Sequence, residues 1–164
     1  MNREERRAME RAQRRLHSAP MYIKAKRAHG RAYAASDLDQ AQVRDLSLLG
    51  HAALTAITQG RGTERDVDQL AVVSNVSLVL AEIGLGADLI PDVHAGQAAI
   101  MSMQARLARV GKAGATGPEL QALNTLMELH DAQLSIPPTV DEMRRAVSEV
   151  RRRREAGQVL EATQ

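Results

Sequence analysis

Basic side chains near the N-terminus are the residues of this chain whose type and spacing best suit a chemical task. We single out eight of them: Arg3, Arg7, Arg11, Arg14, Lys24, Lys26, Arg27 and Arg31. On a helix the first four would fall within a stripe about 80° wide and roughly 16 Å long. Guanidinium groups in such an array suit phosphates and carboxylates. We therefore predict that the eight residues bind nucleic acid or an acidic partner; the alternative is a solvated arm that only aids solubility.

Charge is distributed unevenly along the chain. Residues 1–35 contain ten Lys or Arg and three Glu, residues 36–143 contain six basic and fourteen acidic residues, and residues 144–164 contain six basic and three acidic residues. The formal net charge of +2 therefore conceals a basic arm, an acidic body and a basic tail. Such asymmetry usually indicates a binding surface. We interpret the run 151–154 as structural, because four consecutive arginines surround a helix and cations near its end favour the helix dipole; the alternative is that arginines near Arg151 add to the binding surface of the arm.

The remaining reactive side chains form no catalytic or metal-binding pattern. The chain has no cysteine, and its five histidines include no His-x-x-x-His or Glu-x-x-His pair of the kind that places ligands on one helix face. His130 has acidic neighbours, but it occupies an apolar seam, so we expect a hydrogen-bonded core histidine. No phosphate-binding glycine loop or nucleophile elbow is present. We therefore predict a protein that is not an enzyme, with no catalytic residues, no metal and no cofactor.

Composition predicts one soluble domain in a reducing compartment. The 164 residues suffice for one core, 44% of them are apolar, and no apolar run approaches the roughly 20 residues that span a bilayer. Basic residues at the N-terminus are not followed by the apolar stretch of a signal peptide. We expect a cytoplasmic protein without a membrane partner. Tyr22 and Tyr33 are the only aromatic residues, which favours closely packed helices over a sheet and disfavours base stacking.

The elements that must position these residues all have the pattern of helices. Apolar residues recur at three- and four-residue spacing between Gly and Pro breaks, and the expected helices span about 2–16, 36–60, 63–83, 91–110, 116–134 and 139–155. Three of them begin with a capping pattern, at Thr63, Thr116 and Thr139. Short loops between long helices predict antiparallel neighbours. The predicted fold is all-α: an up-and-down bundle of about five helices (36–156), preceded by a basic helix and arm (1–35) and followed by a tail (157–164).

The third of these helices is predicted to be the central one, because it is apolar on nearly every side. Its only polar seam is Asp68, Asn75 and Glu82, spaced seven apart. The expected core comprises Val76, Val79, Ile100, Met103, Leu123 and Met127. The stretch 69–83 also imitates a helix-turn-helix, with Asn75 at the turn. Its second half offers no basic or amide side chain to base edges, so we interpret the whole stretch as one buried helix.

Three pieces of the body carry a resemblance: Gly60–Thr63, Asn75–Glu82 and Glu128–Leu134, together with the arginine-rich start at Asn2–Arg7. On these pieces the chain resembles a group of small helical proteins of proteobacterial phages, plasmids and integrated elements, often loosely labelled Fis-type regulators. The resemblance implies a mobile-element accessory protein inside a bacterial cell, and it transfers no functional residue.

Two functions follow as predictions. The first is a non-enzymatic accessory protein whose basic N-terminal arm binds nucleic acid or a nucleoprotein complex. The alternative is a protein-interaction inhibitor or adaptor, for host takeover or against defence, that binds a bacterial host protein through the helical bundle. The oligomeric state is left open.

Overall fold

Five long α-helices and one short 3-10 helix make up the part of the chain that the structure, a computed structural model, describes: residues 40–136 and 138–159. They are α2 (Gln40–Thr58), α3 (Glu64–Glu82), η1 (Ala87–Leu89), α4 (Ile90–Val110), α5 (Gly117–Ser135) and α6 (Val140–Glu155). These described residues contain no strand, so the all-α prediction is confirmed there. The predicted basic helix and arm, with all eight basic residues singled out above, lie outside the described residues.

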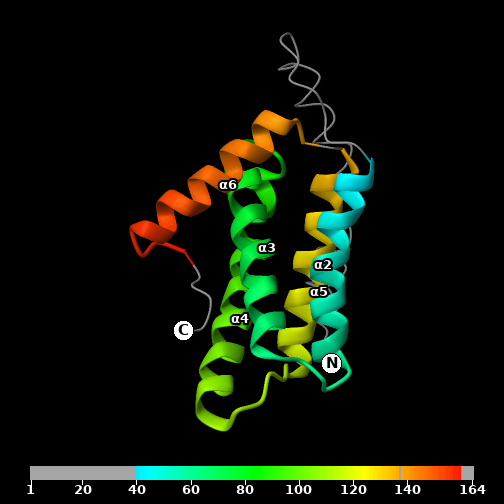
Figure 1. Cartoon of the computed structure of the whole chain (residues 1–164), viewed down its shortest axis with the longest axis vertical. Coiled ribbons are helices and arrows are strands. Elements are labelled where there is room, and N and C mark those ends of the chain that lie inside the picture. The colour runs from blue at the N-terminus through cyan, green and yellow to red at the C-terminus, as the bar shows by residue number, and fades with distance from the viewer. Residues whose placement is uncertain (1–39, 137, 160–164) are drawn as a thin grey trace, which may run out of the picture.

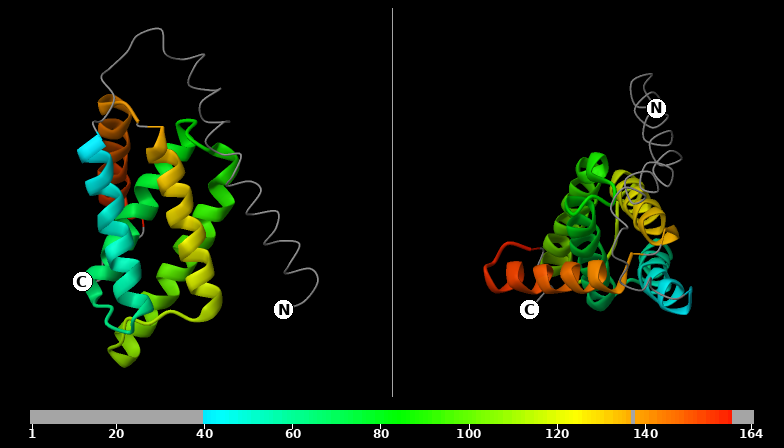
Figure 2. Two further views of the ribbon diagram at one scale, coloured as in Figure 1. Left: turned by 90° about the vertical axis from the view of Figure 1, so that its right-hand side faces the viewer. Right: turned by 90° about the horizontal axis from the view of Figure 1, so that it is seen from above.

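Helices α2 to α5 run alternately down and up, and α5 packs against α2 to close a four-helix ring (Figure 1). Helix α6 crosses obliquely over one end of this ring, where it packs against α3 (Figure 2). Helix α3 contacts α2, α4, α5 and α6, so it is the central helix as predicted. It is continuous from Glu64 to Glu82 without a turn at Asn75, which excludes the helix-turn-helix.

The predicted capping patterns begin three of the helices. The carboxylates of Asp66 and Glu119 accept hydrogen bonds from the backbone N–H of Thr63 and Thr116, at 2.8 and 2.6 Å. At the start of α6 both halves of the box form: Glu142 accepts from the N–H of Thr139 at 2.6 Å and donates its own N–H to the Thr139 hydroxyl at 3.1 Å. Each cap satisfies backbone donors that a helix start otherwise leaves unpaired.

The core prediction is confirmed in most of its positions. Five of the six residues are at most 2% exposed: Val79, Ile100, Met103, Leu123 and Met127. Val76 is only partly buried, because it faces a second, smaller core beneath α6. Apolar spacing also favours burial of Leu49, Val110 and Val147, and this expectation is wrong, because they are 54, 50 and 46% exposed. In α2 the chain instead buries Gly50 and Leu54, because the glycine lets the helix approach its neighbours more closely.

Two glycines allow the ring helices to pack without a side chain between them. A Cβ on Gly96 of α4 would lie 2.9 Å from the Cβ of Leu126 on α5. A Cβ on Gly50 of α2 would lie 2.6 Å from the terminal methyl of Met127. The methionine methyl is the end of a flexible side chain, whereas the Leu126 Cβ is fixed to its backbone. Gly96 is therefore the tighter constraint on helix spacing.

Replacing Gly96 with alanine should destabilise the bundle. Overpacking a core typically costs about 1–3 kcal/mol, and the better helix propensity of alanine returns only about 1 kcal/mol. Gly117→Ala is the matched control, because a Cβ there meets open space in the first turn of α5; it should be neutral or stabilise by about 0.4–1 kcal/mol. Urea unfolding followed by circular dichroism compares the two. A Gly96→Ala protein as stable as the parent would mean that α4 and α5 are farther apart than described.

Candidate nucleic-acid interface

The outward side of α6 carries several exposed arginines. Four exposed arginines occupy it: Arg144, Arg145, Arg151 and Arg152. At 100° per residue they fall within an arc of about 120°, as two pairs roughly 10 Å apart along the helix axis. Exposed Ser148 lies on the same face between the two pairs, and exposed Asp141 and Glu155 fall within the same arc. We call the four arginines and Ser148 the α6 arginine face.

A small apolar core fixes which side of α6 points outward. Ala146 lies almost opposite Arg144 on the helix and is fully buried. It packs in a cluster with Val79, Leu80, Leu85 and Ile136. Because the side chain of alanine is short, α6 approaches α3 closely at this point. The arginines on the far side of the helix are consequently directed to solvent.

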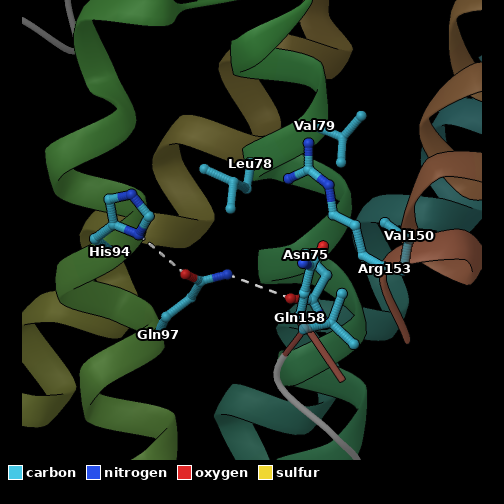
Figure 3. A pocket seen from close by; sticks show the side chains of 9 residues that line it. Asn75, Leu78, Val79, His94, Gln97, Val150, Arg153 and Gln158 are labelled. Atoms are coloured by element: carbon cyan, nitrogen blue, oxygen red, sulfur yellow. Dashed lines mark hydrogen bonds between the residues drawn. The ribbon is translucent and has the colours of Figure 1, made fainter. Parts of the chain in front are cut away.

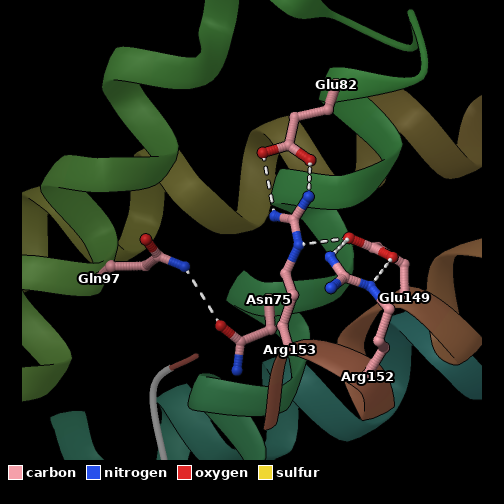
Figure 4. A network of polar contacts seen from close by, with 6 residues as sticks. All are labelled: Asn75, Glu82, Gln97, Glu149, Arg152 and Arg153. Atoms are coloured by element: carbon pink, nitrogen blue, oxygen red, sulfur yellow. Dashed lines mark hydrogen bonds and ion pairs between the residues drawn. The ribbon is translucent and has the colours of Figure 1, made fainter. Parts of the chain in front are cut away.

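Arg153 is the arginine of the run 151–154 that turns inward. It donates two hydrogen bonds to the carboxylate of Glu82 on α3, at 3.0 and 2.5 Å, and a third to Glu149 at 2.7 Å (Figure 4). The hydrogen bonds that Arg153 donates to Glu82 and then to Glu149 raise the pKa of Arg153, so it is permanently charged. A two-pronged arginine–carboxylate contact is geometrically specific. Arg153 therefore ties α6 to the outer end of the predicted polar seam of α3.

Glu149 joins this anchor to the arginine face. It accepts hydrogen bonds from Nε and Nη2 of Arg152, at 2.8 and 2.7 Å, as well as from Arg153 (Figure 4). The hydrogen bonds from Arg152 and Arg153 lower the pKa of Glu149 to about 2. Arg152 is thereby oriented while its side chain stays 62% exposed. Arg145 and Arg151, in contrast, pair with no other described residue.

The interpretation of 151–154 as a purely structural run was therefore incomplete. Arg153 does anchor the end of the helix, but Arg151 and Arg152 continue a face that begins at Arg144 and Arg145. The signal was present in the sequence as two arginine pairs seven residues apart, because residues seven apart return to nearly the same helix face. The run 151–154 alone does not reveal this face, because the face also includes Arg144 and Arg145.

A cavity of about 160 Å³ lies between α3, α4 and the end of α6 (Figure 3). A chain of polar side chains crosses one wall: His94 Nδ1 lies 3.1 Å from Gln97 Oε1, and Gln97 Nε2 donates to Asn75 Oδ1 at 3.3 Å. Leu78, Val79 and Val150 supply apolar surface. Cavities of about 150 Å³ hold a single six-membered ring. The space therefore suits a small molecule or a few waters, and it is too small for a nucleotide.

The interior polar groups form structural contacts. His130 is 3% exposed, and its Nδ1 lies 2.9 Å from the hydroxyl of Ser77, so the predicted core histidine is confirmed. Burial first, and the nearby His51 to a lesser degree, lower its pKa to about 4 against the opposing effect of Asp131. Gln133 donates to the carbonyls of Ser77 and Leu85 at 3.0 Å each, which ties α5 to the end of α3.

Asp131 binds two side chains of α2 on the surface. Its carboxylate accepts from the Ser47 hydroxyl at 2.8 Å, and His51 Nε2 lies 2.7 Å from its other oxygen. The serine hydroxyl thus donates to the carboxylate and not to the histidine, so the three side chains are not arranged as a Ser–His–Asp triad. The arrangement holds α2 against α5. Among the described residues no group of three His, Asp or Glu side chains is placed to hold a metal ion.

Comparison of the chain with family models, with curated proteins and with solved structures finds no match. Within residues 40–136 and 138–159, every helix is too short or too polar to cross a bilayer.

Acidification should destabilise the fold through His130. Its pKa is about 4 in the folded protein and 6.5 ordinarily, so between these values the unfolded chain binds the extra proton. The free energy of unfolding should therefore fall as the pH drops from 6.5 through 4, by up to roughly 3 kcal/mol. His130→Asn should reduce the slope of the unfolding free energy against pH in this range by up to about 1.4 kcal/mol per pH unit relative to the parent. Urea unfolding at a series of pH values measures both slopes, and an unchanged slope in His130→Asn would assign acid unfolding to another group.

Proposed function

We propose that this protein is a non-enzymatic accessory protein of a bacterial mobile element, acting in the cytoplasm, that binds the phosphate backbone of nucleic acid through its two basic segments. One segment is the N-terminal arm with its eight predicted basic residues. The other is the α6 arginine face, which is the observation that carries the proposal. The four exposed arginines, two of them without a described partner, outnumber the exposed carboxylates of Asp141 and Glu155 in the same arc. The face therefore keeps a positive charge to which a polyanion is complementary.

Two of the arginines on the α6 face are paired, and these pairs do not oppose the proposal. Arg144 contacts Asp141 at 2.8 Å, with side chains 70 and 51% exposed, and Arg152 contacts Glu149. Exposed ion pairs of this kind stabilise a protein by only about 0–1 kcal/mol, because water and salt screen them. A phosphate can therefore replace a carboxylate at little cost. Binding does not require the hydrogen bonds between Arg153 and Glu82 to break.

Salt dependence tests the proposal. Each phosphate neutralised by an arginine contributes about −0.9 to the slope of log affinity against log salt. Replacing Arg144, Arg145, Arg151 and Arg152 with Gln should flatten the slope by roughly 3–4, and Gln at Arg3, Arg7, Arg11 and Arg14 should do the same. The unfolding midpoint should barely change. Fluorescence anisotropy with a labelled 30-base-pair duplex, titrated between ~50 and 200 mM salt, gives the slopes.

A matched control separates a binding face from general charge. Four other exposed arginines, Arg44, Arg61, Arg65 and Arg109, lie on α2, α3, α4 and the loop before α3. Gln at these four positions removes the same charge and should leave the slope nearly unchanged. If it flattens the slope equally, binding depends on net charge alone. If the parent protein shows no affinity at ~50 mM salt, where phosphate contacts are strongest, nucleic-acid binding is wrong.

A second candidate function is an inhibitor or adaptor that binds a bacterial protein through the bundle. One observation favours it: consecutive Leu48 and Leu49 on α2 are 56 and 54% exposed. Adjacent large apolar side chains in solvent suit a protein partner better than a polyanion. A pull-down from bacterial lysate with and without nuclease distinguishes the two functions. A single retained protein that resists nuclease and is lost in Leu48→Gln/Leu49→Gln supports this second candidate.

A further inference from the structure

Resting on the proposed function, we propose that the bound nucleic acid is B-form duplex DNA and that the α6 arginine face lies in its major groove. Three observations lead to this choice: how α6 is mounted on the bundle, how its arginines are spaced, and which side chains the described fold lacks.

Helix α6 packs on the bundle through one side, which leaves its opposite side accessible to a DNA groove. Among the long helices of the described fold it packs chiefly against α3, whereas α2 to α5 each contact at least two others in the ring. Its C-terminal half extends past the ring (Figures 1 and 2). The arginine face is opposite buried Ala146, so docking on α3 and insertion into a groove use different sides. The rest of the bundle need not enter the groove.

The dimensions of the face match the major groove of B-form DNA. A helix with side chains is about 10–12 Å across, and this groove is about 12 Å wide and 8.5 Å deep. The two arginine pairs are roughly 10 Å apart along the axis, so with their long side chains they reach phosphates on both rims. Ser148 lies between the pairs, where a hydroxyl can accept from or donate to any base edge. Phosphate contacts therefore dominate, with little discrimination between sequences.

The scarcity of aromatic side chains disfavours single-stranded nucleic acid as the ligand. Proteins that bind single strands stack successive bases on aromatic side chains, at about 1–3 kcal/mol per base. Tyr22 and Tyr33 are the only aromatic residues of the chain, and both lie outside the described residues. The exposed side chains in the arc of the α6 face are arginines, Ser148 and the carboxylates of Asp141 and Glu155, and none of them is aromatic. An RNA duplex fits poorly as well, because its major groove is deep and too narrow for side chains to read.

Three nucleic acids of one sequence test the inference: a 30-base-pair DNA duplex, the corresponding RNA duplex and one DNA strand. Anisotropy at fixed salt should give an affinity for the DNA duplex at least ~10-fold above the other two. Ser148→Glu places a negative charge at the centre of the exposed face without touching the core, and it should weaken duplex binding by at least ~10-fold. Val147→Glu, one residue earlier, is its matched control: Val147 is 46% exposed on a neighbouring side of the helix, and the same charge there should have a much smaller effect.

Chemical protection locates the groove. Guanine N7 faces the major groove, so dimethyl sulfate methylation at N7 should fall where the parent protein binds and recover with Ser148→Glu. Equal affinity for all three nucleic acids, or unprotected N7 on a saturated duplex, would overturn the inference and leave phosphate binding intact. A duplex preference that survives Ser148→Glu but is lost with the N-terminal Gln variant would assign the duplex to the arm and overturn it too. No affinity for any of the three would reject both proposals.

Discussion

Close approach of helices is the constraint on which the described structure depends. A core without phenylalanine or tryptophan is filled by Leu, Val, Ile, Met and Ala, and such side chains fill space only if the helices are near one another. Gly96 and Gly50 supply that proximity at the contacts of α5 with α4 and α2, where even one methyl group would collide with Leu126 or Met127. The spacing of the ring in turn leaves α3 surrounded by four other helices.

Because α3 is surrounded by other helices, several of its polar side chains have hydrogen-bond partners on those helices. A polar group that loses water must find a partner inside the protein. Ser77 therefore meets His130, and the neutral form of that histidine is the one that burial favours. Asn75 is 5% exposed and accepts from Gln97 of α4. Glu82, at the outer end of the same seam, binds Arg153. Each contact joins α3 to a different helix, so the polar side chains of this mostly apolar helix specify how its neighbours are oriented.

The sequence predicted the positions of the helices well, and it predicted less well which side of each helix is buried. Capping pairs and glycine breaks are local, so they placed the starts of α3, α5 and α6 to within about a residue or two of the structure. Apolar spacing could not choose between Leu49 and Gly50 as the inward residue of α2, because that choice depends on how near Met127 lies. The ion pair of Arg153 with Glu82 joins residues 71 apart in sequence, and no local pattern carries it. The eight N-terminal basic residues stay a prediction, since they lie outside the described part.

The placement of Arg153 explains how one helix can be both an anchor and an exposed basic surface. The apolar contacts of Ala146 and its neighbours determine which side of α6 faces α3. Arg153 adds a second constraint on the rotation of the helix about its axis. A bidentate guanidinium contact tolerates little rotation, since both nitrogens must meet both oxygens of Glu82. Fixing that rotation also fixes the direction of the residues on the opposite side. Arg153 thus reinforces the direction in which the outward arginines point, and Glu82 of α3 supports a basic surface that it does not touch.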